Sequence, residues 1–140
     1  MRALQDCRIA FVGGGTMAEA FIRGILGKGI VPPEQIIASD PVEARRCHLT
    51  EVLGICTTAS NAEAVAGADI VVLAVKPQIL GKVLQGLGGK VAPEALLLTI
   101  VAGAKMQTVI QALGVTALVR IMPNTPGQVG EGISAWTATP

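Results

Sequence analysis

The sequence predicts an α/β fold, a doubly wound, mostly parallel sheet with helices on both faces. Two observations carry this prediction. Short apolar runs alternate with longer stretches of helical periodicity along the whole chain, and such alternation is typical of strand–helix–strand units joined by right-handed crossovers. The composition is 51% hydrophobic but only 2% aromatic. A core of Val, Ile, Leu and Ala suits parallel strands that are covered on both faces.

The chain has 140 residues, which suits one domain over residues 1–140 that needs no disulfide or metal to hold its core. The formal net charge of +1 gives no basic field for nucleic acid or a membrane surface. The richest apolar run, residues 70–75, is too short to cross a bilayer. The three cysteines have no CxxC spacing, which indicates reduced thiols, a cytoplasmic location and no metal site.

Each predicted strand is a short apolar run bounded by glycine, proline or a charged residue. Segment 8–12 ends in three glycines, segment 35–39 follows two prolines, and segment 68–75 has the most strand-like composition of all. In chain order the expected strands are 8–12, 35–39, 55–57, 68–75, 96–101, 116–122 and a last strand at 132–137.

The predicted helix 16–28 has apolar residues at helical spacing, and the other predicted helices have a recognisable start or end. Gly54 and Gly114 end two of the helices, Pro77 suits the first turn of another, and Ser60 or Asn61 can cap a short one. In chain order the expected helices are 16–28, 41–53, 62–66, 78–87 and 106–113.

Residues 13–18 read Gly-Gly-Gly-Thr-Met-Ala and fit the pattern G-x-G-x-x-G/A between a strand and a helix. Gly13 allows the tight turn, Gly15 lets a pyrophosphate approach the backbone, and Ala18 lets the helix pack on the strand. The start of the helix offers N–H groups and the positive end of its dipole to phosphates. The sequence therefore predicts a dinucleotide-binding domain of the Rossmann type. The alternative is a glycine turn without a ligand.

The end of the second predicted strand bears on the choice of coenzyme. Asp40 lies where an acidic side chain would meet the adenosine ribose hydroxyls, which favours NAD. Arg45 and Arg46 lie one helical turn further on and could reach a 2′-phosphate, which favours NADP. Asp40 and Pro41 could instead serve only to start the helix. These residues leave the coenzyme open.

Three further motifs are Ala-Val-Lys-Pro at 74–77, Val-Ala-Gly at 101–103 and Met-Pro-Asn-Thr-Pro at 122–126. With the glycine turn, they resemble the N-terminal half of pyrroline-5-carboxylate reductase, the last enzyme of proline synthesis. The resemblance extends from Arg8 to about Trp136. It implies hydride transfer from NADPH, with NADH also possible, to the C=N carbon of a cyclic imine, which gives L-proline.

The resemblance also implies which residues touch the coenzyme, from the pyrophosphate at residues 12–17 to the nicotinamide side at 100–102. The expected coenzyme-binding residues are Val12, Gly13, Gly14, Gly15, Thr16, Met17, Ser39, Asp40, Arg45, Arg46, Asn61, Ala74, Val75, Lys76, Pro77, Ile100, Val101 and Ala102. Asn124 and Thr125 are expected on the substrate side, and no catalytic residue is assigned.

Physical reasons support part of this assignment and leave alternatives for the rest. Segments 74–77 and 101–103 follow predicted strands, at the sheet edge where open α/β sheets bind ligands. Gly103 permits either a close backbone approach or a positive φ. Lys76 could instead be a solvated charge, and Asn124 and Thr125 could form a simple turn between prolines.

Reductases of this family are about twice as long as this chain, and their second half is a helical dimerisation domain that carries much of the substrate site. We therefore expect that half to be missing here and the intact enzyme to be a homo-oligomer. Two other interpretations remain: a β-hydroxyacid or prephenate-type dehydrogenase domain, against which the motif at 122–126 argues, and a non-catalytic NAD(P)-sensing module.

Overall fold

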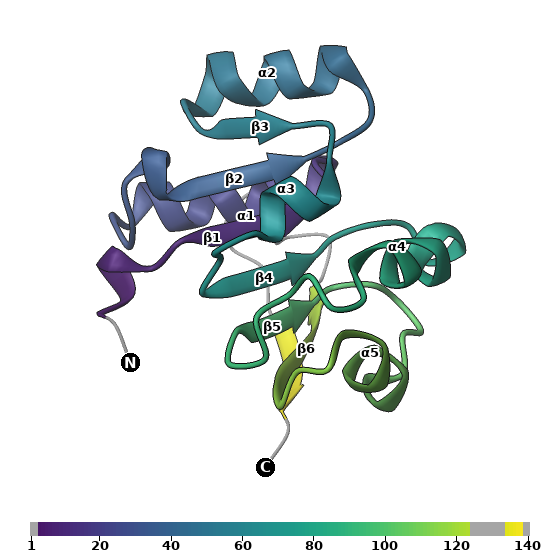
Figure 1. Cartoon of the computed structure of the whole chain (residues 1–140). Coiled ribbons are helices and arrows are strands. Elements are labelled where there is room, and N and C mark those ends of the chain that lie inside the picture. Colours follow the sequence, from purple (N-terminus) through teal and green to yellow (C-terminus); the bar gives the residue numbers. More distant parts are fainter. Residues whose placement is uncertain (1–2, 124–133, 139–140) are drawn as a thin grey trace.

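The computed structural model describes residues 3–123 and 134–138 (Figure 1). Within them, seven strands form one sheet in the order β3-β2-β1-β4-β5-β6-β7. The strands are β1 (Ile9–Val12), β2 (Ile36–Ser39), β3 (Cys56–Thr58), β4 (Ile70–Leu73), β5 (Leu96–Thr99), β6 (Ala117–Pro123) and β7 (Ser134–Ala138). The helices are α1 (Thr16–Gly27), α2 (Glu43–Leu53), α3 (Asn61–Val65), α4 (Leu80–Leu87) and α5 (Met106–Leu113). The predicted doubly wound, mostly parallel sheet is confirmed.

Strand β1 lies between β2 and β4, and all three run in parallel: Val12 is paired with Ser39 on one side and with Leu73 on the other. The chain moves outward from β1 to β3 and then returns to place β4 on the other side of β1. The carboxyl ends of β1 and β4 therefore form the topological switch point, where open α/β sheets bind ligands. Only β7 is antiparallel, to β6.

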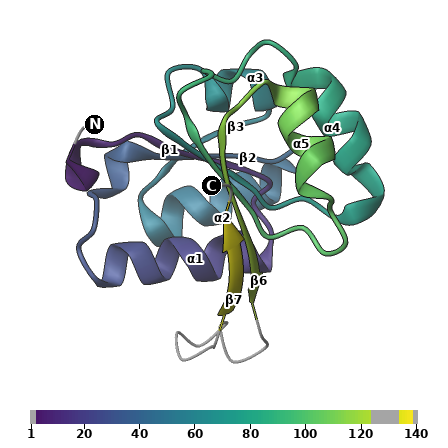
Figure 2. The same ribbon diagram turned by 90° about the horizontal axis from the view of Figure 1, so that it is seen from below.

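Helices cover both faces of the sheet, with α1 and α2 on one side and α3, α4 and α5 on the other (Figure 2). Successive residues of β1 point to opposite faces, as expected for a strand. Ile9 and Phe11 belong to the core beneath α1 and α2, whereas Ala10 and Val12 belong to the core beneath α3 to α5. Because both faces of the central strands are buried, these strands are apolar along their whole length.

Most predicted elements are present with one or both ends displaced by one or two residues. The strand predicted at 68–75 is shorter at both ends and spans Ile70–Leu73, in register with the four residues of β1, which ends at Val12. The strand predicted at 96–101 ends at Thr99. The helix predicted from residue 41 begins at Glu43. The residue before it, Val42, donates its amide N–H to the Asp40 carboxylate.

Short 3-10 turns account for some further differences. The helix predicted at 78–87 consists of the 3-10 turn η3 (Pro77–Ile79) followed by α4. The turns η1 (Leu4–Asp6) and η2 (Pro33–Gln35) were not predicted. Of the two candidate caps of α3, Ser60 is the N-cap, since its hydroxyl accepts from the Glu63 amide. No helix in the described part of the chain is long and apolar enough to cross a membrane.

Candidate coenzyme-binding site

The glycine turn leads from β1 into α1 at the switch point. The Gly13 amide donates to the Ser39 carbonyl (2.9 Å), and the Ala74 amide donates to the Val12 carbonyl (2.8 Å), so three strand ends meet here. Gly13 has a φ of +105°, and a Cβ atom on it would lie 2.5 Å from the Ala74 carbonyl oxygen. Only glycine fits this position, as the sequence predicts.

Gly15 is the N-cap of α1 and provides the open side of the turn. A Cβ atom built on it would meet nothing within 4 Å, and no side chain caps the helix. The first N–H groups of an α-helix have no partner inside the helix. Gly15 and Thr16 are exposed and Met17 is half-buried. The turn therefore presents N–H groups to an open, sterically free space, which fits the pyrophosphate of a dinucleotide.

Gly14, the middle residue of the glycine turn, contacts the segment before α2 and α2 itself. Its amide donates to Asp40 Oδ2 (3.1 Å), while Asp40 Oδ1 accepts from the Val42 amide (2.9 Å). A Cβ atom on Gly14 would lie 2.8 Å from Leu49 Cδ1. Asp40 thus shapes the entry into α2, which was one of the two roles weighed for it, and it also holds the glycine turn, a contact that was not expected. Its contact with the ribose hydroxyls stays a prediction.

Arg45 and Arg46 both reach back from α2 towards this edge of the sheet. Arg45 Nε donates to the Gly14 carbonyl, and its Nη2 lies 2.6 Å from Glu19 Oε1. Arg46 Nη1 donates to the Asp40 carbonyl (2.8 Å). The two arginines are therefore close to the expected ribose position but have different partners.

Glu19 of α1 is a member of this site that sequence reasoning missed. Burial works against its charge, but hydrogen bonds from Arg23, Arg45 and His48 together lower the pKa of the Glu19 carboxyl. His48 of α2 places Nε2 at 3.0 Å from Glu19 Oε1 while its side chain stays 41% exposed. Glu19 thus links α1 to α2 beside the glycine turn.

Ser39 and Asn61 form a second polar contact at the end of β2. Ser39 is fully buried, and its hydroxyl donates to Asn61 Oδ1 (2.6 Å). This bond uses the acceptor end of the Asn61 amide and leaves its donor end for another acceptor. The pair lies where the resemblance predicts the adenosine end of the coenzyme.

The segments after β4 and β5 complete the edge. The Ile100 amide donates to the Leu73 carbonyl (3.1 Å), so the two segments adjoin. Gly103 has a φ of +75° and open space around its Cβ position. The positive φ, and not a close approach of another backbone segment, therefore explains the glycine at this position. The exposed or half-buried residues here are Ala74, Val75, Lys76, Pro77, Ile100 and Ala102, whereas Val101 is buried. Asn124 and Thr125 lie outside the described residues.

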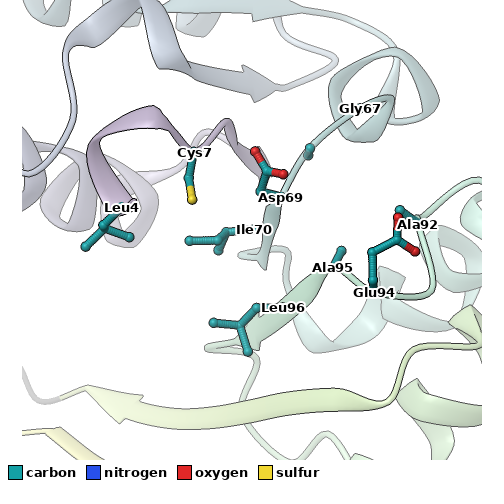
Figure 3. Close-up of a pocket in the computed structure, with 10 residues that line it drawn as sticks. Leu4, Cys7, Gly67, Asp69, Ile70, Ala92, Glu94, Ala95 and Leu96 are labelled. Atoms are coloured by element: carbon teal, nitrogen blue, oxygen red, sulfur yellow. The ribbon is translucent and has the colours of Figure 1, made fainter. Parts of the chain in front are cut away.

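A cavity of about 750 Å³ lies at the opposite edge of the sheet (Figure 3). Leu4, Cys7, Ile70 and Leu96 line it, together with the acidic side chains of Asp69 and Glu94. These residues precede or begin β1, β4 and β5, so the cavity faces away from the carboxyl ends of the strands. It is not part of the coenzyme-binding edge. No cluster of His, Cys, Asp and Glu in residues 3–123 and 134–138 could hold a metal ion.

Comparison with known proteins agrees with this geometry. The chain is 44% identical over 128 residues to pyrroline-5-carboxylate reductase from Pseudomonas aeruginosa, covering 91% of this chain and 46% of that protein. The solved pyrroline-5-carboxylate reductase from Coxiella burnetii matches with a TM-score of 0.89 and 30% identity over 95% of this chain and 50% of its own. The chain thus spans about half the length of the relatives it matches.

A solved structure of Plasmodium falciparum pyrroline carboxylate reductase with NADP bound matches with a TM-score of 0.82 and 28% identity, covering 97% of this chain and 49% of that one. The resemblance inferred from the sequence motifs is confirmed. Residues 8–103, from the first strand to the Val-Ala-Gly motif, match the family described as "NADP oxidoreductase coenzyme F420-dependent". The chain belongs to this family of NADP oxidoreductases.

Proposed function

We propose that this chain is the NADP(H)-binding part of a reductase that converts 1-pyrroline-5-carboxylate to L-proline. The observation that carries the proposal is the open glycine turn at the switch point, where Gly15 leaves free space beside the start of α1. The family description and the relatives named above support the nucleotide and the substrate. Homo-oligomer formation follows from the resemblance and a cytoplasmic location from the cysteine pattern, and both stay predictions.

The residues of the chain would bind and orient the coenzyme. The N–H groups of Gly15, Thr16 and Met17 would hold the pyrophosphate, and the donor end of the Asn61 amide would face the adenosine ribose. Residues 74–77 and 100–102 would flank the nicotinamide side. Bound NADPH would supply the hydride for the C=N carbon. A cyclic imine that is protonated is already electrophilic, so the main task of the protein is to orient the two reactants.

The charges at the end of β2 support NADPH over NADH. Arg46 donates to a backbone carbonyl and has no carboxylate partner within the described residues, so its positive charge is uncompensated there. Both oxygens of Asp40 already accept backbone N–H groups, which lowers their availability to a ribose hydroxyl. We therefore propose NADPH as the preferred coenzyme, with NADH also accepted.

Calorimetric titration of the purified chain with NADPH and NADH tests this proposal. Saturable binding of both, with the lower dissociation constant for NADPH, is the expected result. A folded chain that binds neither coenzyme would overturn the proposal. To separate the reductase from a dehydrogenase or a sensing module, a full-length pyrroline-5-carboxylate reductase that has this chain as its coenzyme-binding part should oxidise NADPH with 1-pyrroline-5-carboxylate, and it should not reduce NADP⁺ with β-hydroxyacids or prephenate.

A further inference from the structure

We propose that Asp40 and Arg45 are positioning residues that clamp Gly14 from two sides, and that Arg45 does not read the 2′-phosphate of the coenzyme. The proposal rests on the proposed coenzyme-binding function and adds that the two neighbouring arginines have different roles. It assigns phosphate recognition to Arg46 and the conformation of the glycine turn to Asp40 and Arg45.

The clamp acts on the two peptide groups that flank Gly14. Asp40 accepts from the Gly14 N–H, and Arg45 Nε donates to the Gly14 C=O. Asp40 lies in the segment that joins β2 to α2, and Arg45 lies in the first turn of α2, so neighbouring parts of the chain hold both sides of a single turn residue. Gly14 is buried, and a side chain on it would displace the Leu49 side chain of α2, whose Cδ1 lies 2.8 Å from the Cβ position. The orientation of the next peptide group, which carries the Gly15 N–H, depends on these contacts.

Arg45 is itself held in place by Glu19. Its Nη2 lies 2.6 Å from Glu19 Oε1, and the side chains of Arg45 and Glu19 are only 28% and 15% exposed. The other carboxylate oxygen of Glu19, Oε2, lies 2.7 Å from Arg23 Nη2. A guanidinium whose Nε and Nη2 are both engaged this way is fixed in one orientation, and re-aiming it at a phosphate would break two charge-assisted bonds.

Arg46 is in a different situation. Its only partner in the part of the chain that the structure describes is the Asp40 carbonyl, and no carboxylate neutralises it there. A guanidinium with free donors and an uncompensated charge suits a phosphate group. Because both coenzymes share the pyrophosphate but only NADPH carries the 2′-phosphate, the two arginines should affect the two coenzymes differently.

The test measures dissociation constants of NADPH and NADH for the parent chain and for Arg45→Met, Arg46→Met and Arg23→Met. We expect Arg45→Met to raise the dissociation constants of both coenzymes by roughly tenfold, which is about the effect of one lost charge-assisted hydrogen bond. The ratio of the two dissociation constants should stay unchanged. Arg46→Met should weaken NADPH alone. Arg23→Met is the matched control, since it removes an arginine from Glu19 without touching the turn, and it should change neither constant.

If Arg45→Met lowers the affinity for NADPH alone, or for neither coenzyme, the clamp is overturned. Arg45→Lys sharpens the test, because lysine keeps the charge but cannot donate as a fork: it should bind both coenzymes as weakly as Arg45→Met. Recovery of NADPH binding in Arg45→Lys would mean that Arg45 reads a charge. A parent chain that binds neither coenzyme would refute the proposed function, which is a separate outcome.

A spectroscopic readout in the coenzyme-free chain reports on the clamp directly. The Gly15 amide nitrogen belongs to the same peptide group as the Gly14 carbonyl, so its ¹⁵N chemical shift should move in Arg45→Met and stay in Arg23→Met. If Arg45→Met does not fold, Glu19→Gln replaces it in this test, because Glu19 holds Arg45 in place. Glu19→Gln should also move the Gly15 ¹⁵N resonance, by a smaller amount than the loss of the Arg45 side chain would. An unmoved Gly15 resonance in the folded variants would overturn the proposal.

Discussion

Three consecutive glycines at residues 13–15 meet three different physical demands. Gly13 needs a positive φ and has a backbone carbonyl where its side chain would be, whereas Gly14 is confined by Leu49. Gly15 has an ordinary φ of −78° and open space, so nothing in the protein itself requires glycine there. A pyrophosphate bound as proposed above would supply the reason for glycine at this position.

The first prediction concerns Gly13. Replacing it with alanine should lower the free energy of unfolding by about 2–4 kcal/mol, because the positive φ and the contact with the Ala74 carbonyl each carry a cost. Gly103→Ala is the matched control: its φ is also positive, at +75°, but no atom lies within 4 Å of the Cβ position. Its loss should be smaller, about 1–2 kcal/mol. Urea denaturation measures both, and equal losses would contradict the role of the carbonyl.

Gly15 is predicted to determine binding without contributing to folding. Gly15→Val should abolish coenzyme binding, since the branched side chain would fill the space beside the start of α1, while the free energy of unfolding stays nearly unchanged. Calorimetric titration and thermal unfolding measure the two effects. Gly86→Val serves as a control because Gly86 also has an open Cβ position but lies in α4. Full affinity in a folded Gly15→Val chain would contradict the assignment of the turn.

Residues of the site differ in how far the sequence reveals them. Gly13, Gly15 and Asp40 follow from a local motif, because one short strand–turn–helix segment fixes their spacing. Glu19 cannot be found in this way, since its partners Arg45 and His48 come from α2. The local sequence of α1 or of α2 does not indicate that the two helices pack against each other. The pattern likewise suggested two arginines as equivalent and could not show that one is engaged by Glu19.

At the scale of elements, helix ends were easier to predict than helix starts. Gly54 and Gly114 have left-handed conformations and end α2 and α5 as expected, because few other residues suit that conformation. The start of α2 depends on Asp40, which accepts from the Val42 amide through Oδ1 and from the glycine turn through Oδ2. That second contact joins distant segments and therefore could not be inferred from local preferences.

The link between α1 and α2 predicts a pH dependence of stability. The hydrogen bonds to Glu19 outweigh its burial and hold the pKa of its carboxyl below the ordinary value of 4.5. Because the pKa is lower in the folded state, ionised Glu19 stabilises the fold above that ordinary value. This stabilisation is lost as the pH falls through the ordinary value towards the folded pKa.

Glu19→Gln should remove this contribution. The parent chain should be more stable than the variant at neutral pH, and the difference should shrink as the pH is lowered to about 3. Urea denaturation across this range measures it, with Glu34→Gln as a control that lacks these partners. A difference between parent and Glu19→Gln that is constant with pH would contradict the pKa argument.

At the scale of the whole molecule, the alternation of strands and helices was enough to predict the parallel sheet. Right-handed crossovers restrict the strand order to few arrangements, and the observed order places the glycine turn next to residues 74–77. The direction of β7 was not predictable, because an apolar alternation indicates a strand but not its partner or its sense. The cavity at the amino ends of the strands also had no signal, since its lining comes from several separate segments.

The last prediction is that these 140 residues bind NADPH but do not reduce 1-pyrroline-5-carboxylate. The proposed coenzyme contacts that the structure describes lie between Val12 and Ala102, within the family match to residues 8–103. For the substrate the sequence offers only Asn124 and Thr125, and the chain covers 46% of the Pseudomonas aeruginosa reductase. Holding two reactants in a productive geometry contributes about 7–11 kcal/mol to catalysis.

Without the partners that orient the imine, turnover should therefore fall below detection although coenzyme binding persists. The measurement is NADPH oxidation in the presence of 1-pyrroline-5-carboxylate, run beside a binding titration on the same preparation. A full-length pyrroline-5-carboxylate reductase serves as the positive control for substrate quality. Turnover by these residues at a comparable rate would mean that they contain the whole substrate site, and that the orientation of the imine depends on side chains among them that we have not assigned.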